Sequence, residues 1–136
     1  MAATSMRSRK LHAALLAMAI APAAAAQAAG SPKWVSYGES ETGAYYFDPA
    51  SIRTDGERKR VWRLFALKEA KDGVQSGKAL IEFQCKEGTY RYMRTLYYSG
   101  PMGQGKYVGG AKAQGTEPVG PGTMIGELAQ RVCTPG

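Results

Sequence analysis

The two cysteines, Cys85 and Cys133, most constrain how this chain of 136 residues can fold. Cys85 ends a segment in which apolar and polar residues alternate, and Cys133 follows an apolar stripe with helical spacing. An exported chain with an even number of cysteines normally joins them outside the cytoplasm. A disulfide here would fasten a terminal helix to a strand and stabilise the fold by about 4 kcal/mol. The alternative is two separate buried thiols.

The N-terminal 28 residues have the features of an export leader. Arg7, Arg9 and Lys10 form a positive head, residues 11–21 form a short apolar run, and residues 26–28 (Ala-Gln-Ala) match a cleavage site. The apolar run is too short to cross a bilayer as a helix. We therefore expect cleavage after residue 28, an exported product in the periplasm or at the cell surface, and no membrane span. The alternative is an uncleaved N-terminal anchor.

The mature chain, residues 29–136, has the size of a single domain. Loss of the three leader cations lowers its formal net charge from +7 to +4. No cysteine follows the predicted cleavage site closely, so the sequence offers no site for a lipid anchor. The only histidine, His12, leaves with the leader. Without histidine, free thiols or clustered acids, the usual parts of catalytic and metal sites are missing, so we expect a protein that is not an enzyme and holds no cofactor or metal.

The first half of the mature chain consists of short β-forming segments separated by turn residues. Residues 34–37 and 44–47 predict a hairpin, and the Asp-Pro pair at 48–49 ends its second strand. The Asp-Gly pair at 55–56 predicts a turn just before residues 61–67. This last segment is apolar on both alternations, which predicts a central strand covered on both faces.

The clearest alternation covers residues 79–85, with one apolar face formed by Ala79, Ile81, Phe83 and Cys85. If residues 87–88 form a two-residue turn, Phe83 pairs with Tyr92 across a hairpin. The same register puts Arg94 opposite Ile81. This mismatch indicates a bulge or a slip in the pairing.

The last third of the chain predicts a long loop and then a helix. Residues 99–122 hold eight glycines and three prolines, and only residues 106–108 suit a short edge strand. Thr123 predicts the start of a helix whose apolar stripe is Ile125, Leu128, Ala129 and Val132. The expected fold class is α+β: a small antiparallel sheet of about five to six strands with one C-terminal helix packed on it and tied by a disulfide.

Three consecutive cations, Arg58, Lys59 and Arg60, form one candidate binding feature. With Arg53 before them and Trp62 after them, they concentrate positive charge around one hairpin, which suits sulfate or phosphate groups of an anionic polysaccharide. The alternative is a solvated turn that keeps a sheet edge soluble.

The tyrosine doublets at residues 45–46 and 97–98 form a second candidate feature. Neighbours on a strand point to opposite faces, so one tyrosine of each doublet must leave the helix-covered side. Tyr46 and Tyr98 are the candidates for a protein interface. The alternative is packing beneath arginine side chains or a second layer.

The chain resembles the surface-adhesin protein E family of exported bacterial proteins. The resembling segments, in chain order, are Trp34, residues 45–52 (Tyr-Tyr-Phe-Asp-Pro-Ala-Ser-Ile), Val61-Trp62, residues 76–78, residues 82–85 (Glu-Phe-Gln-Cys), Tyr90-Arg91, residues 98–103 (Tyr-Ser-Gly-Pro-Met-Gly) and residues 121–123 leading to Cys133. The resemblance implies an antiparallel sheet, a C-terminal helix tied down by a disulfide, and a binding role in the periplasm or at the cell surface. Members that give the family its name attach to host matrix proteins such as vitronectin and laminin.

These observations together predict an exported, non-enzymatic binding protein of the surface-adhesin E type. Its expected partner is a protein of the host matrix or of the envelope, or an anionic polysaccharide, and not a nucleic acid. Two alternatives remain open at this point. One is a periplasmic lysozyme inhibitor, and the other is a structural envelope protein with no soluble ligand.

Overall fold

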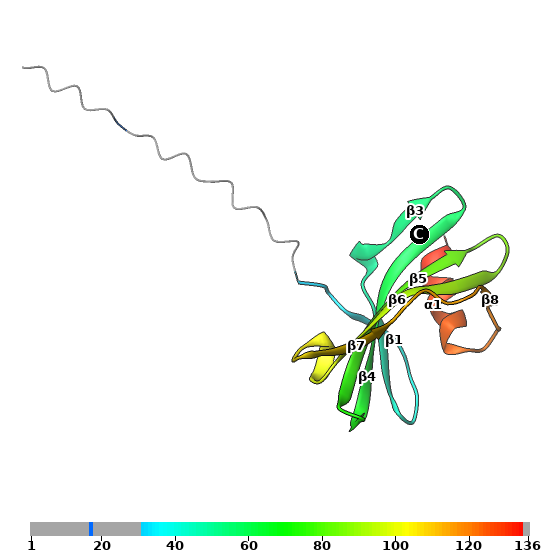
Figure 1. Ribbon diagram of the computed structural model, residues 1–136. Coiled ribbons are helices and arrows are strands. Elements are labelled where there is room, and N and C mark those ends of the chain that lie inside the picture. Colours follow the sequence, from blue (N-terminus) through cyan, green and yellow to red (C-terminus); the bar gives the residue numbers. More distant parts are fainter. Residues whose placement is uncertain (1–16, 18–30, 135–136) are drawn as a thin grey trace, which may run out of the picture. The chain divides into compact units, whose positions relative to one another are not determined.

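The computed structural model describes residue 17 and residues 31–134 (Figure 1). The predicted leader and its cleavage site therefore lie outside the described residues, apart from position 17. No helix in the described part of the chain has the length and apolar character needed to cross a membrane. The elements are the strands β1 (Val35–Glu39), β2 (Gly43–Phe47), β3 (Arg53–Asp55), β4 (Arg58–Lys71), β5 (Val74–Gln84), β6 (Thr89–Tyr98), β7 (Tyr107–Ala111) and β8 (Glu117–Pro118), the 3-10 turns η1 (Pro49–Ser51) and η2 (Pro101–Gly103), and the helix α1 (Met124–Cys133).

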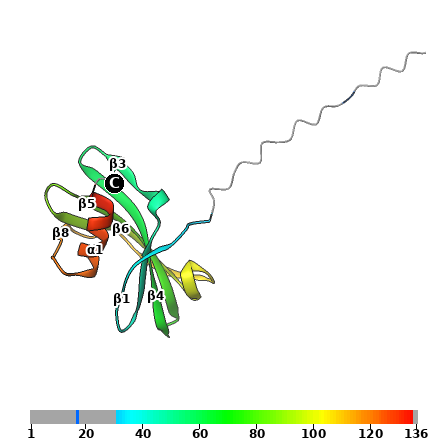
Figure 2. The same ribbon diagram turned by 180° about the vertical axis from the view of Figure 1, so that it is seen from behind.

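The strands form one antiparallel sheet with the order β1-β2-β4-β5-β6-β7. Two short strands extend its edges, because β3 pairs with the start of β4 and β8 pairs with the start of β6. The helix α1 packs on one face (Figures 1 and 2). The predicted α+β fold is confirmed, with six strands in the main path and two short ones beside it.

The long strand β4 lies in the middle of the sheet, as its doubly apolar pattern predicts. Val61 on the helix side and Leu64 on the opposite side are both fully buried. We call the side that carries α1 the helix face. The opposite side, which carries the even-numbered residues of β4 and β5, is the outer face.

The outer face near Leu64 is partly covered by the turn η2. Ser76, fully buried, holds this turn in place: its Oγ donates to the carbonyl of Gly100 at 2.6 Å and accepts from the N–H of Gly103 at 2.8 Å. The start of the glycine-rich segment, residues 100–103, is therefore held against the sheet. The strand β7 of this segment continues to Ala111, past the predicted residues 106–108, because edge pairing with β6 uses main-chain groups and needs no apolar pattern.

The predicted register of the β5–β6 hairpin is wrong. The turn has four residues, 85–88, closed by the N–H of Gly88 on the carbonyl of Gln84 at 2.9 Å, and Gly88 has a positive φ of 69°. Phe83 therefore pairs with Tyr90 instead of Tyr92. A bulge between Leu80 and Ile81 then shifts the pairing by one residue, which moves Arg94 to the outer face opposite Leu80.

The helix α1 supplies the other half of the core. Thr123 caps it, as predicted, with its Oγ1 accepting from the N–H of Gly126 at 3.1 Å. Leu128 and Val132 are buried against the sheet residues Phe47, Val61, Ala79, Ile81 and Phe83. The predicted disulfide Cys85–Cys133 is present and joins the last residue of the helix to the β5–β6 turn.

Candidate functional site on the outer face of the sheet

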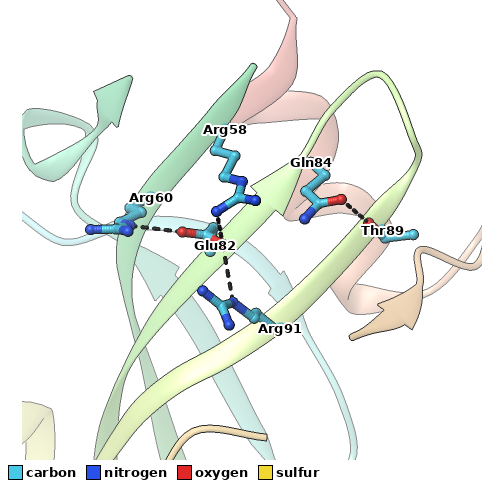
Figure 3. A network of polar contacts seen from close by, with 6 residues as sticks. All are labelled: Arg58, Arg60, Glu82, Gln84, Thr89 and Arg91. Atoms are coloured by element: carbon cyan, nitrogen blue, oxygen red, sulfur yellow. Dashed lines mark hydrogen bonds and ion pairs between the residues drawn. The ribbon is translucent and has the colours of Figure 1, made fainter. Parts of the chain in front are cut away.

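Three arginines surround one buried carboxylate on the outer face (Figure 3). Glu82 is 1% exposed; its Oε2 accepts from Nε of Arg60 at 2.9 Å, and its Oε1 accepts from Nε of Arg91 at 3.0 Å. Nη1 of Arg58 lies 3.9 Å from Oε1. The sheet register produces this group, because Arg60, Glu82 and Arg91 stand directly opposite one another on β4, β5 and β6. We call these four residues the arginine cluster.

The arginine cluster carries an excess of positive charge. Burial alone would raise the pKa of Glu82, but the hydrogen bond from Arg60 and the charge and hydrogen bond of Arg91 outweigh it, so the pKa falls below its ordinary value of 4.5. Glu82 is therefore ionised at neutral pH, and three guanidinium groups share one negative charge. Their side chains remain 52%, 40% and 35% exposed for Arg58, Arg60 and Arg91. Each guanidinium has five N–H donors, so several face solvent.

The structure separates the three consecutive cations that the sequence brings together. Arg58 and Arg60 lie on the outer face, whereas Lys59 lies on the helix face, where its Nζ donates to the carbonyl of Val132 at 3.3 Å. A cation there also suits the negative end of the helix dipole. Arg53 stands opposite Arg60, but its guanidinium donates to main-chain carbonyls of residues 50 and 52.

Two members of the cluster, Glu82 and Arg91, are not among the binding residues that the sequence predicts. The predicted two-residue turn pairs Arg91 with Gln84, one step away from the acid. A signal was present, because Glu82 is the acid on the polar side of the alternating segment 79–85. Only the four-residue turn places Arg91 opposite it.

The tyrosine doublets are split between the two faces. Tyr46 and Tyr98 lie on the outer face, opposite Leu64 and Ser76 respectively, and both are half-buried. Tyr98 also forms an edge-to-face pair with Tyr107, with ring centroids 6.2 Å apart. The side chains of Tyr46 and Tyr98 are therefore partly accessible to a partner.

The tyrosines on the helix face have aromatic partners inside the protein. The ring of Tyr45 lies 6.1 Å from that of Tyr37, and the ring of Tyr97 lies 6.3 Å from that of Phe65.

Among residues 17 and 31–134, no group of three or more His, Cys, Asp or Glu side chains is placed to hold a metal ion.

Comparisons with known proteins agree with this fold. The family model for surface-adhesin protein E matches residues 34–134. A crystal form of protein E from Haemophilus influenzae is 24% identical, with a TM-score of 0.56 over 65% of this chain and 79% of that one. The selenomethionine form of the same protein is 18% identical, with a TM-score of 0.58 over 76% and 92%.

A third structure, protein E from non-typeable Haemophilus influenzae, is 20% identical, with a TM-score of 0.54 over 74% of each chain. At these identities the structural likeness shows the fold alone. No curated protein matches the sequence significantly. The family match extends over nearly all the described residues, from Trp34 to Thr134. The chain therefore belongs to the surface-adhesin protein E family.

Proposed function

We propose that this protein is an exported, non-enzymatic attachment protein whose outer face binds an acidic partner through the arginine cluster. Membership of an adhesin family supports the binding role, and a surface or periplasmic location fits the same family. The partner is an acidic group carried by a host matrix or envelope molecule. The observation that carries the proposal is the exposure of three arginines around one buried acid.

The cluster has more positive charge than its own stability requires. One arginine would neutralise Glu82, and the second hydrogen-bonded one would satisfy its other oxygen. Arg58 is the most exposed of the three and sits 3.9 Å from the acid, too far for a hydrogen bond, so it adds little to the internal pairing. Its charge is therefore available to a ligand.

The geometry also lowers the cost of binding. Glu82 holds the side chains of Arg60 and Arg91 in one orientation before any ligand arrives. Ordering a long side chain at an interface costs about 0.5–1.5 kcal/mol, and part of that cost is already met here. Guanidinium groups bind carboxylate, sulfate and phosphate with paired N–H donors, so the cluster suits any of these acids.

Replacing Arg58 with serine tests the proposal. We expect R58S to bind immobilised heparin and acidic polypeptide at least about tenfold more weakly, because one charge-assisted contact is worth about 1.5–3 kcal/mol. The measurement is the dissociation constant at fixed ionic strength, repeated at higher salt, where the difference should shrink.

Lys71→Ser is the matched control, since Lys71 is an exposed cation at the far end of the same strand. It makes the same change in net charge away from the cluster and should bind as the parent protein does. Equal losses for R58S and K71S would mean that net charge alone drives binding and would contradict the proposal. So would unchanged binding by R58S.

A further inference from the structure

A small groove on the outer face gathers both tryptophans of the chain. It has a volume of about 240 Å³ and is lined by Pro32, Trp34, Asp48, Trp62, Lys78, Leu96 and Tyr98. Its walls come from the segment before β1, the residue that follows β2, and the strands β4, β5 and β6. Residues far apart in the sequence thus form one aromatic hollow.

The chemistry of the groove suits a sugar ring. Aromatic faces carry partial negative charge and attract the weakly positive C–H bonds that line one side of a pyranose ring. Asp48 and Lys78 add one acceptor and one donor for hydroxyl groups, and their formal charges cancel. Pockets for drug-sized molecules are larger, about 300–1,000 Å³, so this groove has room for about one ring.

The half-buried state of the lining leaves these groups available. Trp34, Trp62 and Tyr98 are each half-buried, and the amine of Lys78 lies 5.2 Å from the centroid of the Tyr98 ring. A cation–π attraction to this ring, and not an ion pair with a carboxylate, holds Lys78 at the wall of the groove. Oδ1 of Asp48 accepts from the N–H of Ala50 at 3.0 Å, and its other carboxylate oxygen is available to a ligand.

The groove and the arginine cluster lie next to each other on one face. Trp62 follows Arg60 by two residues on the same side of β4, a separation of about 7 Å along the strand. Leu80 stands between Trp62 and the exposed Arg94 in the same cross-strand row. In a polymer of sugar rings with acidic groups, one ring could occupy the groove while the acidic groups of the neighbouring units reach the guanidinium groups.

We propose that this groove holds one ring of an acidic polysaccharide while acidic groups of the adjoining units bind the arginine cluster and the neighbouring Arg94. The inference rests on the proposed function and narrows its acidic partner to a polysaccharide. Net positive charge alone would accept an acidic protein equally well. The neutral aromatic groove is the feature that favours a sugar.

Tryptophan fluorescence tests the inference directly, because Trp34 and Trp62 are the only tryptophans in the sequence and both line the groove. Titration with heparin should change the emission in a saturable way. Titration with polyglutamate at the same ionic strength should bind the arginines and leave the emission unchanged. Heparin binding without an emission change, or an equal change with polyglutamate, would overturn the inference.

Trp34→Ala supplies the second readout. Trp34 precedes β1 and lies outside every strand, so its removal should leave the fold intact, as circular dichroism can verify. We expect W34A to bind heparin about tenfold more weakly and polyglutamate as before, with Trp34→Phe retaining most of the heparin affinity. Unchanged heparin binding by W34A would refute the sugar site.

The two variants separate the groove from the proposed function. If R58S loses affinity for both polymers while W34A loses neither, the arginine surface stands and the sugar groove fails. If R58S loses affinity for neither, the proposed function itself fails.

Discussion

Arg60 and Arg63 are three residues apart on β4 and are stabilised near the core by different partners. Arg60 has a carboxylate partner on the outer face. Arg63 interrupts the apolar helix face and has aromatic partners: its guanidinium carbon lies 5.5 Å from the Tyr45 ring centroid and 5.0 Å from that of Tyr92. Its Nε is buried with no hydrogen-bond partner among the described residues. Its Nη1 donates to the hydroxyl of Tyr37 at 3.5 Å, and the two ring faces supply the rest of the attraction that holds this charge in place.

At the same scale, Glu82 should make stability depend on pH. Its pKa is lower in the folded protein than its ordinary value of 4.5, so the stabilisation is present above that value and is lost as pH falls through the folded pKa. We expect Glu82→Gln to lower the free energy of unfolding at pH 7 by about 2 kcal/mol, since it removes a buried partner of two charge-assisted hydrogen bonds. The variant should also lose less stability than the parent on acidification below pH 4.5.

Urea unfolding at pH 7 and at acidic pH measures both effects. Glu57→Gln is the matched control, because Glu57 is 70% exposed and pairs at 3.7 Å with Lys86, itself 77% exposed. A surface pair of this kind contributes at most about 1 kcal/mol. Equal effects of the two substitutions would show that Glu82 has no special role.

At the scale of elements, the close approach of the helix to the preceding loop depends on one glycine. Gly126 is buried in the first turn of α1, and a Cβ there would lie 2.7 Å from the carbonyl oxygen of Gly120. That atom belongs to the main chain and cannot rotate away. The helix therefore accepts the weak helix former at this position because nothing larger fits beside the loop.

Gly126→Ala should destabilise the protein although alanine is the better helix former. We expect a loss of about 1–3 kcal/mol in the free energy of unfolding, because overpacking outweighs the gain in helix propensity. Gln130→Ala, an exposed position of the same helix, should leave stability within about 0.5 kcal/mol of the parent. Thermal or urea unfolding measures the stability of both variants, and a G126A variant more stable than the parent protein would contradict this packing.

At the scale of the whole molecule, the disulfide holds the end of α1 against the helix face of the sheet. It joins residues 48 positions apart and connects the end of α1 to the turn between β5 and β6. Lys59 reinforces the same junction through the carbonyl of Val132. On the outer face, β4, β5 and β6 carry the arginine cluster (Figure 3). The same three strands supply Trp62, Lys78, Leu96 and Tyr98 to the groove.

A double variant, Cys85→Ser with Cys133→Ser, should lose about 4 kcal/mol of stability, the chain-entropy value for a loop of this length. The apolar contacts of Leu128 and Val132 remain, so we expect native circular dichroism with a lower urea midpoint. The parent protein in reductant should shift toward the same midpoint. If neither the variant nor the reduced protein loses stability, the bond contributes nothing to the fold.

The sequence by itself determined the local elements of this protein. A run that is apolar on both alternations indicated β4, and alternation with period two indicated β5. Thr123 indicated the start of α1, and the even pair of cysteines indicated the disulfide that ties the helix to the sheet. These features depend on neighbours within a few residues or, for the disulfide, on the chemistry of one residue type. They could therefore be predicted without knowing how the strands pair.

Only the tertiary structure decided which side chains meet. The four-residue turn at 85–88 sets the register that brings Arg91 to Glu82, and the bulge between Leu80 and Ile81 places Arg94 on the outer face. Strand parity places Lys59 on the other face. The groove needs five separated segments at once. The physical reason is that a slip of one residue turns a side chain to the opposite face, so the composition of a site depends on pairing that no local pattern encodes.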